Sequence, residues 1–233
     1  MHKHKLAALA ATGAVAALLA GCSTPAAPVD HRPAYPAAHI GDETVYAIPV
    51  NASIRAYSTV EEFAAIASVI VVGTLTAAQD VAKEVAVDPS EEGVAPGEGP
   101  DLYGALTFTV TSVVKAPAKP STVKVWYESG KRDASDPKKR IGNLHAGLSR
   151  LQRPDSSLRS PSEFAGRTFV VMLTANKSSM KLSTGEYPLA HPLGIAEVLA
   201  DGTLLFGDGS VSPVMVGSTL IKVTLDQLKA AVK

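Results

Sequence analysis

Cysteine, aromatic residues and net charge are all scarce in this sequence. Its 233 residues include one cysteine and 5% aromatic residues, and 22 Lys and Arg balance 22 Asp and Glu. One cysteine excludes an intramolecular disulfide and a metal centre built from several thiolates of one chain. The charge balance argues against a protein that coats nucleic acid, so no nucleic-acid partner is expected. What the sequence does have is 46% hydrophobic residues, which is sufficient for a folded core.

The segment before the cysteine is typical of an export signal. Residues 1–5 form a basic head, and residues 6–20 form an uncharged apolar run that is too short and too rich in alanine for a transmembrane helix. The run ends in Leu19-Ala20-Gly21-Cys22, which resembles the lipobox of bacterial lipoprotein precursors. An ordinary secretory signal and a helical membrane anchor are the alternatives.

The resemblance to a lipobox implies a specific modification. In such precursors the cysteine thiol receives a diacylglyceryl group and the chain is then cut just before that cysteine. Small residues at the two preceding positions allow the chain to enter the peptidase. The resemblance therefore implies a signal peptide over residues 1–21, an acylated Cys22, and membrane lipid as a partner on the outer side of the cytoplasmic membrane. Two acyl chains would make such an anchor durable.

The mature chain divides into a tether and one domain. Removal of residues 1–21 leaves two more acidic than basic residues. Residues 22–43 are rich in proline and alanine and have no apolar periodicity, which predicts a flexible tether. Residues 44–233 are expected to form a single β-rich domain. Without disulfides, this domain must be stable through burial of its core.

Apolar patterns in residues 44–233 predict strands more often than helices. Ser58 as N-cap with Glu61 at the third helical position predicts a short helix, and Thr224 with Gln227 predicts a second one near the end of the chain. The near-continuous apolar run of residues 68–76 predicts a strand buried on both faces. Further strand patterns occupy residues 103–115, 123–127, 168–173, a segment around Tyr187, 194–199 and 203–206. We therefore predict an all-β fold, either a small OB-like barrel or a sandwich, of about six or seven strands with two short capping helices.

Two charged segments interrupt the strand patterns. Residues 80–101 hold seven acidic residues and one basic residue and are expected to form an acidic insertion. They lack the spacing of a calcium-binding loop, so a solvated loop is favoured. Residues 129–163 hold eight basic and four acidic residues and are expected to form a basic insertion. Within it, Lys138, Lys139 and Arg140 are candidate contacts with anionic lipid or an envelope polymer; the alternative is that their charge only keeps a long insertion soluble.

Several strand patterns resemble those of a secreted bacterial family. The matching segments are residues 67–75, which end in Val72-Gly73-Thr74-Leu75, residues 108–115, residues 169–173, Tyr187-Pro188 and Gly194-Ile195. Many members of that family are actinobacterial lipoproteins without an assigned activity. The strand order over residues 58–200 is also similar to the netrin-like module of tissue inhibitors of metalloproteinases, an OB-type barrel. Inhibition does not carry over, because it requires a free N-terminal cysteine and a disulfide framework.

Motifs for catalysis are missing from the sequence. It contains no His-Glu-x-x-His, no Gly-x-Ser-x-Gly and no phosphate-binding Gly-x-x-x-x-Gly-Lys-Ser/Thr. No metal or other cofactor is therefore expected. His191 lies between prolines, in Pro188-Leu189-Ala190-His191-Pro192, which favours a rigid turn over a catalytic role.

Taken together, these features predict a lipid-anchored lipoprotein outside the cytoplasm. We expect a non-enzymatic binding or envelope-associated module, with an anionic envelope polymer or a protein as its partner. An envelope hydrolase with a site near His191 and the acidic segment is the first alternative. The second alternative, an inhibitor or regulator of a surface enzyme, rests on analogy of fold alone.

Overall fold

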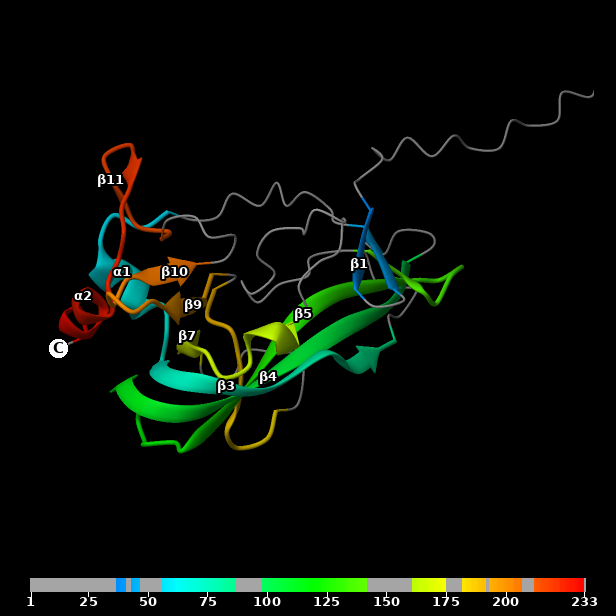
Figure 1. Cartoon of the computed structure of the whole chain (residues 1–233), viewed down its shortest axis with the longest axis horizontal. Coiled ribbons are helices and arrows are strands. Elements are labelled where there is room, and N and C mark those ends of the chain that lie inside the picture. The colour runs from blue at the N-terminus through cyan, green and yellow to red at the C-terminus, as the bar shows by residue number, and fades with distance from the viewer. Residues whose placement is uncertain are drawn as a thin grey trace, which may run out of the picture. The chain divides into compact units, whose positions relative to one another are not determined.

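Three long antiparallel strands dominate the computed structural model (Figure 1): β3 (Val69–Val85), β4 (Glu98–Lys115) and β5 (Thr122–Asp133). The structure describes residues 37–40, 43–46, 56–86, 98–141, 161–174, 182–191, 193–206 and 212–232. These residues form twelve strands and two short α-helices, so the predicted all-β fold with two short helices is confirmed. The strands outnumber the six or seven that the sequence predicts, because most of the additional ones are only two to four residues long.

Shorter strands extend the sheet on both sides of the three long ones. On the side of β3 lie β7 (Thr168–Leu173), β9 (Ile195–Val198) and β10 (Leu204–Phe206). On the side of β5 lie β6 (Lys139–Ile141), β2 (Glu43–Tyr46) and β1 (Ala37–Ile40). The order is β1-β2-β6-β5-β4-β3-β7-β9-β10, and along this path only β2 and β6 run parallel to each other.

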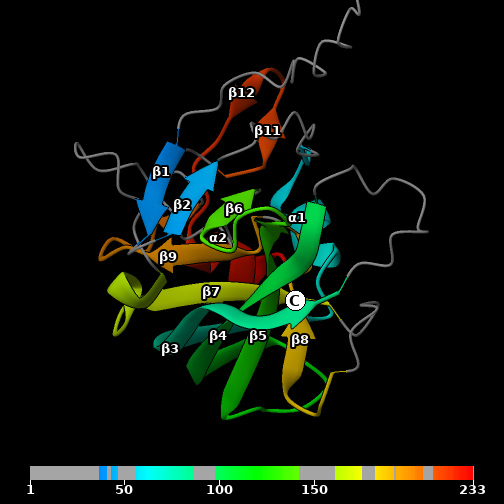
Figure 2. The same cartoon turned by 90° about the vertical axis from the view of Figure 1, so that its right-hand side faces the viewer.

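One further strand, β8 (Glu186–Pro188), closes part of this sheet into a ring. It pairs in parallel with β5, where Val125 lies opposite Tyr187, and Figure 2 shows the two strands side by side. The two residues that follow β8 lie alongside β7, because Leu189 bridges to Leu173 and the Ala190 N–H donates to the carbonyl of Met172 at 3.0 Å. Strands β3, β4, β5, β8 and β7 therefore enclose a small barrel, the arrangement that removes open edges from a sheet.

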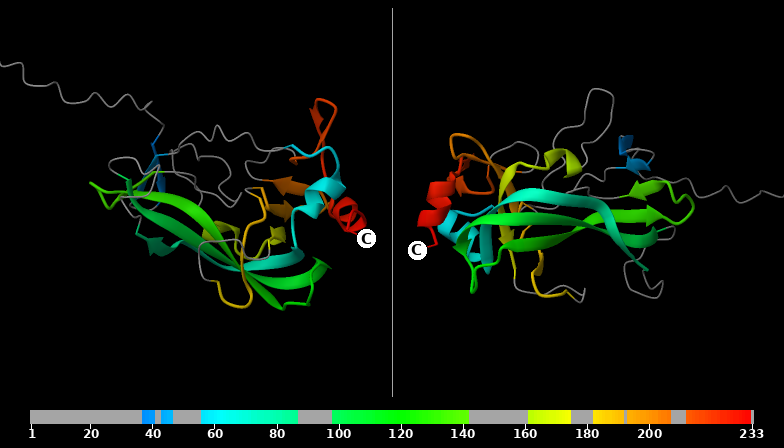
Figure 3. Two further views of the ribbon diagram at one scale, coloured as in Figure 1. Left: turned by 180° about the vertical axis from the view of Figure 1, so that it is seen from behind. Right: turned by 60° about the horizontal axis from the view of Figure 1, so that its bottom comes forward.

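The first part of β3, residues 69–75, is buried on both faces, as its apolar run predicts. Val69 and Val71 point into the ring, whereas Ile70 and Val72 point outward into a second core. Two helices, α1 (Val60–Ala65) and α2 (Leu225–Ala230), cover that outer core at the end of the sheet where β3 begins (Figure 3). Strand β7 alternates in the same way. Its ring-facing side chains are Phe169, Val171 and Leu173, and its outward ones are Val170 and Met172.

Both helices begin at polar caps, as the sequence predicts, but the first cap lies one residue later. The Thr59 hydroxyl accepts the N–H of Glu62 at 3.1 Å, so the N-cap is Thr59 and the prediction of Ser58 is wrong. Ser58 instead donates its own N–H to the Glu62 carboxylate at 2.9 Å. The predicted capping box between Thr224 and Gln227 at the start of α2 is confirmed.

Three segments expected to be irregular contain strands. β3 continues to Val85 and β4 begins at Glu98, so both ends of the acidic segment 80–101 belong to a hairpin. In the basic segment 129–163, β5 continues to Asp133, and β6 and a 3-10 turn, η1 (Pro161–Phe164), are also formed. β1 likewise begins within the expected tether, residues 22–43. Polar residues can form these strands because the backbone N–H and C=O groups bond to the partner strand, and these hydrogen bonds do not depend on the side chains.

A small separate hairpin follows the main sheet, formed by β11 (Met215–Val216) and β12 (Thr219–Leu220). A left-handed Gly217, with φ of 62°, lies in its two-residue turn. Glycine suits this position because it carries no Cβ to clash there.

Among the residues that the structure describes, no helix has the length and apolar character needed to cross a bilayer.

Replacing Phe169 by alanine tests the core inside the ring. Phe169 is fully buried, and its ring packs at a steep angle against that of Phe108, with centroids 5.9 Å apart. The variant should lose about 3–5 kcal/mol of unfolding free energy, because apolar burial is lost and a cavity is left. Thr109→Ala, on the exposed side of β4, should change the free energy by less than about 0.5 kcal/mol. Urea unfolding measures both, and similar losses in the two variants would contradict the ring.

Candidate functional site

The predicted lipid attachment lies outside the residues that the structure describes. The structure describes no residue before Ala37, so it does not include Cys22 or the preceding Leu19, Ala20 and Gly21. The acylated cysteine therefore stays a prediction from the sequence.

The three predicted basic contacts do not share one surface. Lys138 is exposed, and Lys139 is partly exposed with its ammonium group 3.7 Å from the Asp136 carboxylate. Arg140 is only 1% exposed, so the prediction that it contacts an anionic surface is wrong. It lies in β6 directly opposite Arg132 of β5, and side chains that are paired in this way point to the same face of the sheet. That face is the inner one at this end of the long strands.

Two irregularities occur in the long strands, at Asp80 of β3 and at Ser129 of β5. Pairing of β3 with β4 jumps between Gln79 and Lys83, and Asp80 lies within this bulge. Pairing of β4 with β5 is shifted at Ser129. Such bulges redirect side chains and are frequent next to functional sites.

Gly104 provides the space that this polar cluster needs. It lies opposite Tyr127 in the ladder between β4 and β5. A Cβ atom at Gly104 would overlap the Tyr127 ring, so the ring lies across the glycine backbone. Tyr127 is thereby held within the inner core, where its hydroxyl is removed from water.

The charges around Tyr127 shift its ionisation strongly. Burial raises the pKa of the Tyr127 hydroxyl far above its usual range, the negative charge of Asp80 raises it further, and Arg140 partly opposes both effects. Ser129 is also only 1% exposed, and its hydroxyl has no hydrogen-bond partner within the described part of the chain. We call Asp80, Tyr127, Ser129 and Arg140 the inner polar cluster.

An ion pair next to this cluster ties β3 to β5 across β4. The Arg132 guanidinium donates to one carboxylate oxygen of Glu84 from Nε at 3.0 Å and from Nη2 at 2.6 Å, and its Nη1 donates to the carbonyl of Pro137 at 2.6 Å. Arg132 and Arg140 would repel each other on one face, so nearby carboxylates are required. Glu84 supplies one next to Arg132, and Asp80 supplies a second negative charge near Tyr127, where its effect is opposite to that of Arg140.

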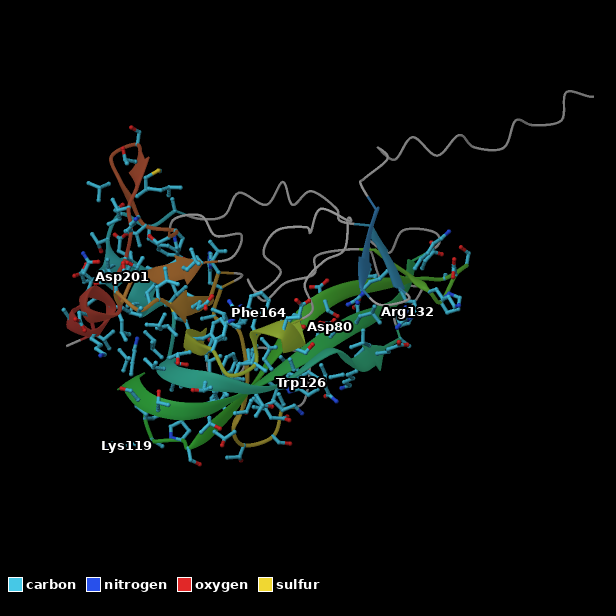
Figure 4. All side chains as sticks on the ribbon, viewed as in Figure 1. Asp80, Lys119, Trp126, Arg132, Phe164 and Asp201 are labelled. Atoms are coloured by element: carbon cyan, nitrogen blue, oxygen red, sulfur yellow. The ribbon has the colours of Figure 1, made fainter. Side chains whose placement is uncertain are left out.

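The opposite, outer face of β4 and β5 carries a different set of side chains. Trp126, the single tryptophan of the chain, lies opposite Ala105, and Tyr103 is its diagonal neighbour. Both aromatic residues are partly exposed. Figure 4 shows Trp126 and Asp80 on opposite sides of the long strands, and alternation along β5 places Trp126 on the side away from the buried Val125 and Tyr127. We call this surface the aromatic face and define it by Gln79, Tyr103, Ala105, Lys124, Trp126 and Glu128.

Charged groups surround the two rings of the aromatic face. The Lys124 ammonium group lies 4.3 Å from the centre of the Trp126 ring and 3.1 Å from the Glu186 carboxylate. Backbone hydrogen bonding from Ser183, with help from Lys124, lowers the pKa of Glu186 despite partial burial. Burial, followed by the charges of Asp101 and Glu128, raises the pKa of Tyr103. Aromatic rings with amide, carboxylate and ammonium groups beside them can bind a ligand by stacking and hydrogen bonding together.

His191 is packed among aromatic rings and lies far from the described ends of the acidic segment, residues 80–86 and 98–101. Its ring centroid is 5.8 Å from that of Tyr57 and 6.2 Å from that of Phe63, and its Nδ1 accepts the Leu193 N–H at 3.0 Å. Burial lowers its pKa.

The neighbourhood of His191 lies at the other end of β3 from the described acidic residue Glu84. The residue before it bonds to Met172, which pairs with Ile70 at the beginning of β3. Glu84 lies fourteen residues further along that strand, on the order of 40 Å away. A single site near His191 and the described part of the acidic segment is therefore excluded. Within the described ranges, no three His, Cys, Asp or Glu residues are grouped so that they could hold a metal ion.

Comparison with known proteins finds no similar protein: no family model, no curated protein and no solved structure matches the chain. The resemblances to a secreted lipoprotein family and to the netrin-like module therefore stay predictions.

The sequence analysis did not predict the aromatic face, although the sequence pattern of β5 contains a signal for it. In Val123-Lys124-Val125-Trp126-Tyr127, the alternation that buries Val125 and Tyr127 leaves Trp126 on the outside.

Alkaline pH should destabilise the protein through Tyr127. Its pKa is raised in the folded protein, whereas a tyrosine of the unfolded chain titrates near pH 10. Above about pH 10 the unfolded chain therefore binds fewer protons, and the free energy of unfolding should fall by up to about 1.4 kcal/mol per pH unit. Below that pH the contribution of Tyr127 is fully present.

Urea unfolding at a series of pH values checks this dependence. Tyr127→Phe keeps the ring and removes the titrating hydroxyl, so its stability should fall less steeply in the alkaline range. Equal slopes for the wild type and the variant would show that Tyr127 is not shielded in this way.

Proposed function

We propose that this protein is a lipid-anchored module outside the cytoplasm that binds a glycan polymer of the cell envelope through its aromatic face. The observation that carries the anchoring is the motif Leu19-Ala20-Gly21-Cys22 at the end of a basic and apolar export segment. Between Cys22 and β1, which begins at Ala37, the extended chain could span on the order of 40 Å. The domain can thus reach into the envelope layer above the lipid head groups.

The aromatic face supports binding of a sugar polymer. Sugar rings present apolar C–H faces that stack on aromatic rings, and Tyr103 and Trp126 offer two such rings at diagonal positions. Gln79 and Glu128, both exposed, lie in the same or adjacent cross-strand rows and suit hydroxyl groups. Flat sheet faces of small barrels bind extended oligosaccharides in this manner.

Lys124 gives the aromatic face a preference among polymers. It covers part of the Trp126 ring while Glu186 holds it at 3.1 Å. An anionic group on the polymer would compete with Glu186 for this ammonium group, and the ring would then become accessible. A polymer with acidic substituents should therefore bind better than a neutral one, and this advantage should shrink as salt increases.

Metabolic labelling with radioactive palmitate tests the anchor. The wild-type protein should incorporate the label, because acylated Cys22 carries fatty chains, and Cys22→Ala should not. Ser23→Ala serves as the matched control and should be labelled like the wild type. A wild-type protein without label, or a labelled Cys22→Ala variant, would refute lipidation at this position.

Fluorescence of the single tryptophan tests the aromatic face. Titration with soluble fragments of envelope glycan should change the emission of Trp126, since no other tryptophan contributes. Tyr103→Ala should weaken binding about five- to tenfold through loss of one stacking surface, while Thr109→Ala on the same strand should bind like the wild type. Thermal unfolding confirms that both variants are folded. Undiminished affinity in Tyr103→Ala would argue against this face as the binding surface.

A further inference from the structure

The hairpin of β11 and β12 carries the large apolar side chains that are most exposed to solvent among the described residues. Val216 is 59% exposed and Leu220 is 43% exposed, and they are the only large hydrophobic side chains with high exposure among the described residues. Residues 212–222 contain a single charged residue, Lys222. Exposed strand edges are usually protected by charges, and residues 212–221 carry none, so this hairpin lacks the protection that would keep an apolar partner away.

The base of this hairpin is firmly attached to the barrel domain. Val214 is fully buried in the outer core, and the Met215 N–H donates to the carbonyl of Tyr57 at 2.7 Å. The Ser212 hydroxyl donates to the carbonyl of Ile221 at 2.8 Å, and the Ile221 N–H donates to the carbonyl of Val214 at 3.0 Å. The tip therefore projects from a fixed base, as Figure 2 shows at the top of the view.

The register of the hairpin distinguishes between kinds of partner. Met215 lies opposite Leu220, and Val216 lies opposite Thr219, so the two exposed apolar residues point to opposite faces of the hairpin. A protein surface or a second copy of the chain would cover one face and leave the other in water. A lipid layer surrounds the tip and covers both faces at once.

We propose that the tip of this hairpin inserts into the lipid layer that holds the acylated Cys22; the inference rests on the proposed anchor. Insertion is shallow, because the outer backbone groups of a two-stranded hairpin have no partners and cannot enter hydrocarbon without a large cost. Val216 and Leu220 reach the boundary between head groups and acyl chains. Lys222, which is exposed just behind the tip, lies at the level of the lipid phosphates.

The anchor makes such a small contact effective. Two partly buried aliphatic side chains gain too little free energy to hold a free protein on a membrane. A protein already attached through Cys22 has a high local concentration of lipid surface, so the same contact becomes populated. The hairpin therefore sets the orientation of the domain, while the acyl chains supply the affinity.

A fluorescent probe on the lipidated protein tests the insertion. In the acylated protein the sulfur of Cys22 is part of a thioether, so Val216→Cys provides the only free thiol for an environment-sensitive dye. The protein is reconstituted in vesicles of phosphatidylcholine and phosphatidylglycerol. We expect a blue shift of the emission and stronger quenching by lipids with a spin label near the head group than by lipids labelled at the chain end.

Lys119→Cys provides the matched control on the exposed connection between β4 and β5. Figure 4 shows Lys119 near the lower edge of the view, away from the β11–β12 hairpin at the top. Its probe should keep the emission of a water-exposed dye and should not be quenched by either lipid. Leu220→Cys repeats the measurement at the second exposed position and should behave like Val216→Cys.

Two outcomes would overturn the proposal. Equal emission and quenching at positions 216 and 119 would show that the tip stays in water. A blue shift at position 216 that grows with protein concentration and is not quenched by labelled lipid would show contact with a second copy instead. Mass spectrometry of the N-terminal peptide separates these results from failure of the anchor itself, because an unmodified Cys22 would overturn both proposals.

Discussion

Burial of both faces of β7 and of the first part of β3, residues 69–75, is the constraint on which the architecture depends. A strand with apolar side chains on both sides needs two covers, and the chain supplies a closed ring on one side and two short helices on the other. Among the described residues the ring closes through the short β8, with Tyr187 paired to β5 and Leu189 bridged to β7. Beyond the ring, β3, β4 and β5 continue as a ribbon with charged side chains.

The two faces of that ribbon carry different kinds of side chain. On the inner face, Arg132 is paired with Glu84, and the charges of Asp80 and Arg140 act in opposite directions on the buried hydroxyl of Tyr127. Charges that are satisfied internally are poor binding groups for an outside ligand. The outer face carries two partly exposed rings and few internal constraints apart from the Lys124–Glu186 pair, which makes it the better surface for a polymer.

The proposed anchor, hairpin and aromatic face would act together. Acyl chains on Cys22 would hold the domain at the membrane, and the β11–β12 tip would define which side of the domain faces the lipid. With one side fixed, the aromatic face would meet the envelope polymer in a restricted range of orientations. Such a restriction would raise the effective concentration of the polymer near the aromatic face, so a modest affinity for each sugar unit would be sufficient for binding.

Local sequence patterns determined the strand-rich fold, the strand of residues 68–76 with two buried faces, the capping box at Thr224 and the motif at Cys22. Each of these features depends on residues that are close together in the sequence, so the spacing of apolar and polar residues is sufficient to predict it. Only the tertiary structure decided that Arg140 is buried, that His191 is remote from the acidic residues at the described ends of the acidic segment, and that β8 closes a ring. Each of these depends on partners far away in the sequence, and a local pattern of charge or hydropathy carries no information about which distant strand will lie alongside.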